Sequence, residues 1–394
     1  MVKYKPLFLH DDYDKYFFNR KEDIKKIEYQ INAVKYSLPQ QLLLLGVRGV
    51  GKTYLLKKII DDCDSSIVCS YIDMQQVYSL EKDDLSIEMV LIELLNCMDA
   101  SIADEDYGLS FRSKVVHLVE RLKLKDYDFS DCAELFNIPI PRVDDDYKKL
   151  ARFVMEFPQR VVDEVDGVEG FVIVIDEFQM LSEVDHLDKF FGLIRSFNQF
   201  QHNVSYVFTG SISSRSDVIE SVNGDSGAFG GRLQQITIEP FSKEETRAYF
   251  DECMSEIRFT EDGFDRFYKC TRGIPLYINS FYNVMDSGEV YDAVLVRDAF
   301  FSNMEQILIK WVKIWSGLSS SEKEIVKVLV EDNFLSWTDL LAALSFSRNT
   351  FNKYLSGLIR KGILAYVDGK YFIEDEMLMI WLKHEKEVYG SYPL

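Results

Sequence analysis

The sequence predicts an α/β domain whose parallel sheet is covered by helices on both faces, followed by two smaller regions. Continuous apolar runs, such as Gln41–Leu45 and Phe171–Ile175, are typical of parallel strands buried on both faces. These runs alternate with helical patterns over the first 240 residues, which favours βαβ units. The pattern is then helical to about Lys313, and the chain ends in a mixture of helices and a hairpin.

The composition agrees with a folded chain of this class. The 394 residues are enough for two or three domains, and 47% hydrophobic with 28% charged residues excludes a disordered or fibrous chain. Lys and Arg number 45 against 65 Asp and Glu. The resulting net charge of −20 argues against a non-specific nucleic-acid coat, although it leaves room for a local basic surface.

Cysteine and histidine spacing gives no sign of a metal site. The six cysteines include no CxxC pair, and the five histidines lie outside metal-ligand spacing of one another. We expect free thiols in a reducing compartment. The first residues lack a signal-peptide pattern, and no apolar stretch approaches the ~18 residues of a membrane span. These features predict a cytoplasmic protein with no membrane contact.

The elements of the first domain are expected in the following order. A helix over residues 19–35 begins at Asn19, its expected cap, and carries isoleucines on one face. Strands are expected over residues 41–45, 67–72, 171–175, 204–209 and 235–238. Residues 85–165 are expected to be mostly helical, with an acidic, irregular stretch at 139–146. Capping boxes at Ser242 and Ser319 begin the helical region and the last region.

The glycine-rich turn after the first strand matches GxxxxGK[ST] and precedes a helix. It comprises Gly46, Val47, Arg48, Gly49, Val50, Gly51, Lys52 and Thr53. Such glycines let backbone N–H groups face phosphate oxygens, and the helix presents its positive end to the same anion. Lys52 is expected to contact the β- and γ-phosphates of ATP, and the Thr53 hydroxyl to bind Mg²⁺. The alternative is an ordinary glycine turn.

Two acids follow the third long apolar run. Asp176 is placed to hold Mg²⁺ through water, and Glu177 to orient and deprotonate the attacking water. The alternative is a pair of acids in a surface turn, which a preceding phosphate-binding loop disfavours. The next strand ends at Ser211. If that strand lies between the other two, Ser211 can bond the phosphate or the attacking water; a capping serine is the alternative.

A second short motif points elsewhere. Gly224-Asp225-Ser226-Gly227 matches the loop around the nucleophile of trypsin-like proteases. Those enzymes need an all-β double barrel and partner His and Asp residues. Within an α/β domain, we interpret the tetrapeptide as a flexible loop.

Taken in order, the motifs of residues 17–280 resemble the archaeal-type ATPases of the AAA+/STAND group. The resemblance is carried by Phe18–Glu22, Gly46–Thr53, Ile175–Gln179, Thr209–Ser211, Gly231-Arg232 with Ile236–Glu244, and Gly273–Pro275. Asp23 departs from the usual placing of an acid in the first motif. The resemblance implies a P-loop NTPase core over residues 1–240 with a helical insertion at about 100–150, a helical lid over 241–316 and a winged helix over 317–394.

The resemblance also implies roles for single residues. Arg232 stands where related ATPases carry an arginine finger, which stabilises γ-phosphate charge on a neighbouring subunit; a surface arginine is the alternative. Pro275 would lie against the adenine, or simply begin a helix. Arg272 stands where relatives often have glycine, and it could face the γ-phosphate instead.

The last region predicts a winged helix from its own pattern. Ser319 and Ser336 cap two helices, and Asp368-Gly369 joins two strand patterns, which is a strong hairpin signal. The polar face of a third helix carries Arg348, Asn349, Asn352, Lys353 and Arg360. Residues 347–361 contain no acid, as suits a recognition helix in a major groove. The region has 9 basic and 11 acidic residues, so a protein-docking module is the alternative.

Together these features predict an ATPase that depends on ATP and Mg²⁺. Its nucleotide state, ATP or ADP, would control its assembly as a homo-oligomer and its engagement of double-stranded DNA or a protein partner through the winged helix. The alternatives are a low-turnover nucleotide switch or scaffold for protein docking, and an origin-recognition-like initiator that binds DNA.

Overall fold

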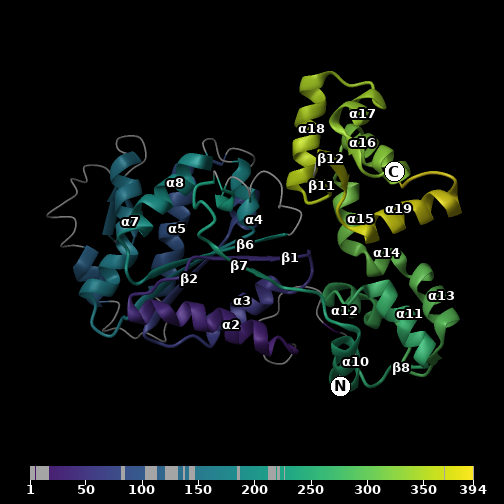
Figure 1. The fold of residues 1–394 in the computed structure, drawn as a ribbon, viewed down its shortest axis with the longest axis horizontal. Helices are drawn as coiled ribbons and strands as arrows, with labels where there is room; N and C mark the ends of the chain where they lie inside the picture. Colours follow the sequence, from purple (N-terminus) through teal and green to yellow (C-terminus); the bar gives the residue numbers. More distant parts are fainter. Residues whose placement is uncertain are drawn as a thin grey trace.

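The computed structural model describes residues 5, 17–80, 85–102, 113–119, 132–135, 138–141, 147–183, 187–211, 219, 222–225, 227–367 and 369–393. Figure 1 shows an α/β core on one side of the molecule and two helix-rich regions on the other. We call residues 241–316 the lid and residues 317–393 the C-terminal module. Within the described ranges, no helix has the length and apolar character needed to cross a membrane.

The core contains a five-stranded sheet with the order β2-β5-β6-β1-β7, and every pairing in it is parallel. The strands are β1 (Leu42–Gly46), β2 (Ile67–Asp73), β5 (Gly170–Asp176), β6 (Val204–Ser211) and β7 (Gln234–Thr237). They confirm the five expected strands, and β7 begins one residue earlier than expected. Because β6 lies between β5 and β1, the carboxyl ends of these three strands meet at one edge.

Helices cover both faces of the sheet, as predicted. On one face lie α2 (Lys21–Asn32), η1 (Ala33–Tyr36) and α3 (Lys52–Asp61); on the other lie α5 (Ile87–Ile102), α7 (Tyr147–Glu164) and α8 (Leu187–Asn198) (Figure 1). Leu42 and Leu44 pack into the first core, and Leu43 and Leu45 into the second; all four are fully buried. Burial on both sides explains the run of four leucines.

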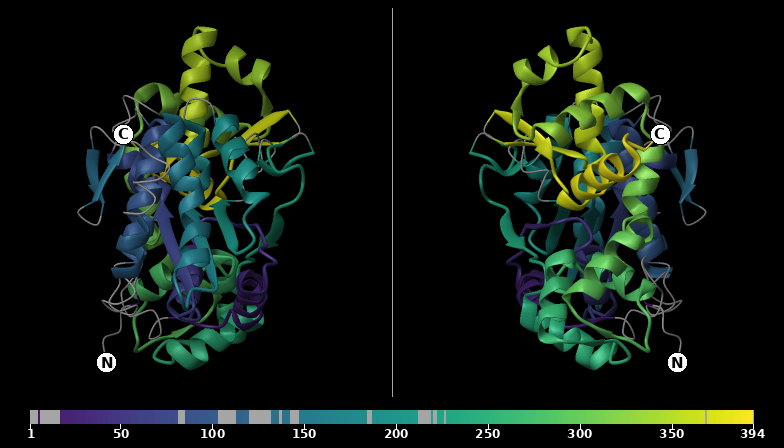
Figure 2. Two further views of the ribbon diagram at one scale, coloured as in Figure 1. Left: turned by 90° about the vertical axis from the view of Figure 1, so that its left-hand side faces the viewer. Right: turned by 90° about the vertical axis from the view of Figure 1, so that its right-hand side faces the viewer.

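Two expectations for the core are wrong. Residues 85–165 are mostly helical where the structure describes them, as expected, but residues 139–141 of the stretch expected to be irregular belong to an antiparallel hairpin, β3 (Cys132–Leu135) and β4 (Ile138–Pro141), which Figure 2 shows projecting from the side of the core. Asn19 does not cap α2. Its side-chain amide donates to Glu245 (2.6 Å), and Arg20 occupies the cap position with left-handed backbone and no side-chain cap bond. A contact with the lid therefore takes the polar group that the sequence pattern assigned to the helix end.

The lid is mainly helical, as predicted, with one short pair of strands. It comprises α10 (Lys243–Cys253), β8 (Arg258–Phe259), α11 (Glu261–Thr271), α12 (Pro275–Val284), β9 (Val290–Tyr291), α13 (Ala293–Ser302), α14 (Met304–Ile307) and α15 (Ile309–Ser316). The capping box at Ser242 is confirmed, because its hydroxyl accepts from Glu245 N while the Glu245 carboxylate accepts from Ser242 N.

The C-terminal module combines helices with a three-stranded sheet of the order β10-β12-β11. It comprises α16 (Ser320–Glu331), β10 (Leu335–Ser336), α17 (Trp337–Ala342), α18 (Arg348–Arg360), β11 (Leu364–Val367), β12 (Lys370–Ile373) and α19 (Glu376–Tyr389). The caps at Ser319 and Ser336 and the hairpin β11–β12 are confirmed. The sequence pattern gave no expectation for α19.

One hydrophobic core is common to the lid and the C-terminal module. It contains lid residues from Phe241 onward and module residues as far as Leu382. Trp311, Trp315 and Trp381 are among its largest fully buried side chains, and the rings of the last two meet edge to face at 6.3 Å. The expected boundary at residue 316 falls within this core.

Candidate functional site

A cavity of about 540 Å³ lies at the carboxyl edge of the sheet, between the core and the lid. The core contributes residues 48–54, Asp73, Gln75 and Glu177, and the lid contributes Phe241, Tyr249, Pro275, Leu276, Asn279 and Lys310. Phe17, Phe18 and Arg20 close it from the N-terminal side. The cavity thus brings the glycine-rich loop and one of the two predicted acids together with lid residues, of which the sequence connected only Pro275 to the nucleotide.

The glycine-rich loop wraps the first turn of α3 and touches the lid. Gly49 and Gly51 have φ values of 83° and 99°, which only glycine adopts without steric cost. A Cβ at Gly49 would lie 2.8 Å from the Cβ of Leu276, whose backbone N–H donates to the Gly49 carbonyl (3.2 Å). The loop therefore packs directly on α12, so a movement of the lid would also displace the loop.

Lys52 points back into its own loop. Its side chain is buried, and its ammonium donates to the carbonyl of Gly46 (2.9 Å). Burial lowers the pKa of Lys52, and the carboxylates of Glu177 and Asp176 partly oppose that shift. A buried ammonium satisfied only by neutral carbonyls gains from an arriving anion, since hydrogen bonds between charged groups are stronger.

Asp176 is the centre of a hydrogen-bonded cluster. It is buried and accepts hydrogen bonds from the hydroxyls of Thr53 (2.8 Å), Tyr71 (2.7 Å) and Thr209. Burial and the nearby Asp176 carboxylate raise the pKa of Tyr71, so its hydroxyl stays a donor. The contact with Thr53 brings together the two residues predicted to hold Mg²⁺. Tyr71 and Thr209 were missed as members of this cluster, because they come from two other strands.

Glu177 follows β5 and lines the cavity. Its backbone is left-handed (φ 52°), and its carboxylate accepts a hydrogen bond from the Gln179 side-chain amide. A Cβ at Gly210 would lie 2.9 Å from Oε1 of Gln179, so this glycine leaves the space that Gln179 occupies. Ser211 pairs with Gly46 across β6 and β1, and its side chain lies outside what the structure describes.

Arg20 joins three parts of the cavity wall. It donates to the carbonyls of Glu239 (2.6 Å) and Val50 (3.1 Å), and its guanidinium lies 4.6 Å from the ring centroid of Phe241. Burial lowers the pKa of Arg20. The sequence placed Arg20 in a motif without giving it a role, since its acceptors are backbone atoms far along the chain.

A group of three aromatic residues lines the cavity on the side of the lid and the N-terminal segment. The ring of Phe18 lies 4.9 Å from Tyr249 and 5.8 Å from Phe241, centroid to centroid. Pro275 begins α12 and also lines the cavity, so its contact with adenine stays a prediction. The flat, apolar surface here suits a nucleobase.

The two other arginines of interest lie outside the cavity. Arg232 is exposed and precedes β7, so it lies at the amino edge of the sheet, opposite Lys52. Arg272 ends α11 with left-handed backbone and forms an ion pair with Glu376 of the C-terminal module. The protease-like tetrapeptide also lies in the core; Gly227 N bonds to Gly224 O (2.9 Å), and Ser226 is outside the described residues.

The candidate DNA-contacting residues lie on α18. Four of them are exposed on its first half: Arg348, Asn349, Asn352 and Lys353. The side chain of Arg360 is not among those that the structure describes. Asn352 accepts a hydrogen bond from Trp337 Nε1 (2.8 Å), and the guanidinium of Arg348 lies 6.0 Å from the centroid of the Trp337 ring. The ammonium of Lys361, just beyond the helix, is paired with Glu322 (2.6 Å).

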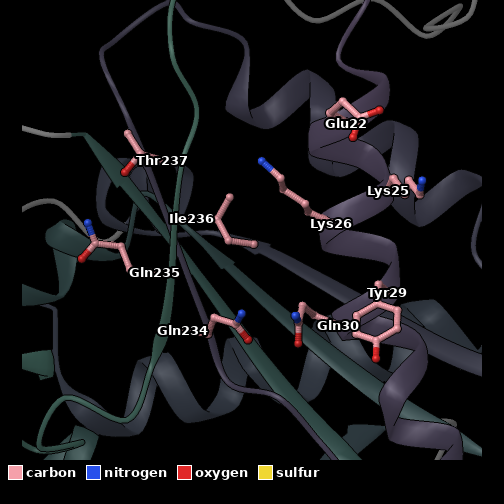
Figure 3. Close-up of a pocket in the computed structure, with 9 residues that line it drawn as sticks. All are labelled: Glu22, Lys25, Lys26, Tyr29, Gln30, Gln234, Gln235, Ile236 and Thr237. Carbon is pink, nitrogen blue, oxygen red and sulfur yellow. The ribbon is translucent and has the colours of Figure 1, made fainter.

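A second hollow of about 540 Å³ lies between α2 and the edge strand β7. Figure 3 shows Lys26 extending from α2 toward Ile236 and Thr237, with Gln30 facing Gln234. None of the predicted site residues lines it.

Comparisons with known proteins bear on the family and the fold of this chain. A family model described as an ATPase domain predominantly from Archaea matches residues 17–281. A solved structure, the Walker-type ATPase of Pyrococcus abyssi, is similar with 17% identity and a TM-score of 0.58, over 94% of this chain and 97% of that one. A search of curated proteins gives no match.

Two further solved structures are more distant. The ORC1 protein of Aeropyrum pernix in complex with DNA has 13% identity and a TM-score of 0.47, over 97% of this chain and 96% of that one. A variant of the Thermotoga maritima RuvB protein has 13% identity and a TM-score of 0.40, over 94% and 96%. The family model spans well over half of the chain and includes the loop and acids of the cavity. This chain therefore belongs to the family of ATPase domains found predominantly in Archaea.

Proposed function

We propose that this chain binds ATP with Mg²⁺ in the cavity between the core and the lid, and hydrolyses it. The observation that carries the proposal is the 2.8 Å contact between Thr53 and Asp176, at the carboxyl edge of the sheet and beside Lys52 and Glu177. These four side chains have the chemistry of a P-loop ATPase site: a cation, a hydroxyl, a metal-binding carboxylate and a base.

The residues present fit Mg²⁺. A hydroxyl and a carboxylate are hard oxygen ligands, and Mg²⁺ usually takes only one or two protein ligands besides water and phosphate oxygens. Among the described residues, no separate group of three or more His, Cys, Asp or Glu side chains could hold a metal. Thr53 and Asp176 would hold the ion, which when bound neutralises charge on the phosphate oxygens.

The remaining residues bind and orient the substrate. Lys52 exchanges the Gly46 carbonyl for phosphate oxygens, and the backbone N–H groups of the glycine-rich loop bond the same phosphates. Glu177, held by Gln179, orients a water molecule and accepts its proton as the water attacks the terminal phosphate. Phe18, Tyr249 and Pro275 offer an apolar surface to the base.

Equilibrium nucleotide binding and phosphate release test this function. Lys52→Ala should lose tight ATP binding, because the buried cation at the phosphates is gone. Glu177→Gln should keep binding and lose turnover by ~10²–10⁴-fold, the usual range for a general base. Glu244→Gln, at an exposed position of α10, is the control and should match the unaltered chain. Unchanged turnover in Glu177→Gln would remove Glu177 from the mechanism. Binding without any turnover would favour the low-turnover switch or scaffold.

A second proposal concerns the C-terminal module, which we infer to be a winged helix that engages double-stranded DNA. Its support is the exposed polar and basic first half of α18 and the hairpin that follows that helix. An origin-recognition-like initiator would use the same face. A protein-docking module is the competing function, because the region carries more acids than bases.

Salt titration of duplex binding by the full-length chain separates the two. Lys353→Ala should weaken binding to every sequence and flatten the salt slope by ~0.9 per lost phosphate contact. Asn349→Ala should instead relax sequence preference. Lys383→Ala, exposed on α19, is the control. Undetectable DNA binding at low salt, with and without ATP, would favour protein docking over DNA binding.

A further inference from the structure

Lys310 is a cation in the cavity to which the sequence gave no role. It is the second residue of α15, the helix that leads from the lid into the C-terminal module, and it lines the cavity together with Lys52 and Glu177. Within the described part of the chain, no group forms an ion pair with its ammonium or accepts a hydrogen bond from it. Lys310 is partly buried, and a charge that is partly removed from water without a partner gains from an arriving anion.

The charges around Lys310 come from several elements. Arg48 of the loop and Lys52 of α3 disfavour its positive charge, whereas Glu177 after β5 and Asp375 before α19 favour it. Burial outweighs both and lowers the pKa of Lys310 to about 8. The charge interactions with Lys52 and Glu177 indicate that the ammonium lies near the two side chains expected to act on the terminal phosphate.

Two contacts connect this position to the C-terminal module. Trp311, the next residue, donates from Nε1 to the Tyr277 hydroxyl (2.8 Å), and that hydroxyl donates to Asp375. Arg48 donates from Nη1 to the carbonyl of Lys361 (2.9 Å), which ends α18, and its guanidinium lies 5.8 Å from the Trp311 ring. The wall that carries Lys310 is therefore continuous with the module.

We propose that Lys310 binds the terminal phosphate of a nucleoside triphosphate, and that this bond sets the position of the C-terminal module relative to the core. The proposal rests on the proposed nucleotide site and adds the residue through which that site distinguishes triphosphate from diphosphate. An ammonium on α15 that bonds a phosphate held by the loop joins the module to the core across the cavity. With diphosphate, that bond is missing.

The first test measures the affinity of the full-length chain for ADP and for a non-hydrolysable ATP analogue, each with Mg²⁺. Lys310→Met removes the charge and keeps the length of the side chain. It should lower the affinity for the analogue by ~10-fold or more, because a hydrogen bond between charged groups is lost. The affinity for ADP should change by less than about 2-fold. Lys310→Arg should retain most of the affinity for the analogue. Lys313→Met, exposed on the same helix, is the matched control.

Unchanged analogue binding in Lys310→Met would overturn the proposal, as would an equal loss for ADP and the analogue. If the unaltered chain bound neither nucleotide, the nucleotide site itself would be wrong and the proposal would fail with it. Binding by the unaltered chain without an effect at Lys310 would overturn this inference alone.

The second test addresses the link to the module. Hydrogen exchange is measured over residues 361–376 with ADP and with the analogue. The analogue should change exchange in the unaltered chain and in Lys313→Met, and should leave Lys310→Met in its ADP-like state. An equal response of Lys310→Met to the analogue would overturn the link.

Discussion

The two walls of the nucleotide cavity are built in different ways. The core wall includes the glycine-rich loop and Glu177, and each of these directly follows a strand of one parallel sheet; Asp176, which binds Thr53 of the loop, is the last residue of β5. The lid wall includes Leu276 and Lys310, which come from different helices of the lid, and Arg48 contacts Trp311 of the lid and Lys361 of the C-terminal module. The residues proposed to act in hydrolysis thus lie within short segments, whereas the connection of the cavity to the C-terminal module depends on how distant segments pack.

This difference explains what could be predicted from the sequence. The five strands, the loop, Thr53 and Asp176 follow from local patterns, because a buried strand followed by a glycine turn or an acid leaves few alternative structures. Tyr71 and Thr209 escaped prediction, since only the strand order places them against Asp176. Lys310 escaped because nothing within its own helix indicates that it faces a cavity.

The errors in the fold have the same origin. Asn19 has the residue type of a helix cap, yet Glu245 of the lid binds its amide. Trp311, Trp315 and Trp381 lie in one hydrophobic core with residues of both the lid and the C-terminal module, a contact that no local pattern indicates. Sequence periodicity shows that a helix face is buried without showing which element buries it.

The largest expected effect tests whether the two walls make a complete site within one chain. Arg232 belongs to neither wall, so at the opposite edge of the sheet the arginine-finger role predicted for it requires a second copy of the chain. Arg232→Ala should lower turnover by ~10³-fold and leave ATP affinity nearly unchanged, as expected for an arginine finger. Phosphate release and nucleotide binding measure both, with Arg258→Ala, exposed on β8, as the control.

Mixing Arg232→Ala with Glu177→Gln sharpens this result. A shared interface can then contain an intact base from one copy and an intact arginine from the other, so part of the activity should return. A mixture that forms oligomers and stays inactive would rule out action on a neighbour.

The next prediction concerns the pH dependence of the affinity for the ATP analogue, which we expect to come from Lys310 of the lid wall. The pKa of Lys310 is lowered to about 8, so its ammonium is protonated at pH 7 and largely neutral above pH 9. A bound phosphate favours the protonated form, and phosphate monoesters are already fully ionised in this range, with a pKa of ~6. Affinity for the ATP analogue should fall above pH 8, by at most ~10-fold per pH unit.

Lys310→Arg provides the comparison for this pH profile, because a guanidinium stays charged throughout. Its analogue affinity should be nearly flat between pH 7 and pH 9. A fall of equal steepness in Lys310→Arg would assign the titration to another group.

The smallest effect comes from the contact between the glycine-rich loop and the C-terminal module. Arg48→Met should remove the hydrogen bond to the Lys361 carbonyl and the contact with the Trp311 ring, while its stem still packs. We expect a loss of about 1 kcal/mol in the free energy of unfolding, since the bond is partly exposed. Chemical denaturation measures it, with Arg297→Met in an exposed ion pair as the control. An unchanged free energy would show that this contact contributes little to stability.

Because the lid and the C-terminal module share one hydrophobic core, we expect them to move together as one rigid body. The polypeptide enters it from β7 through a short segment whose Glu239 carbonyl is held by Arg20, and this segment can serve as the pivot. The 13 residues of α18 rise ~20 Å from Arg48 at one end to the exposed Arg348 at the other. When a rigid body rotates, displacement grows with distance from the pivot. A small shift at Lys310 would therefore produce a larger displacement at the first residues of α18, which extends away from the lid (Figure 1).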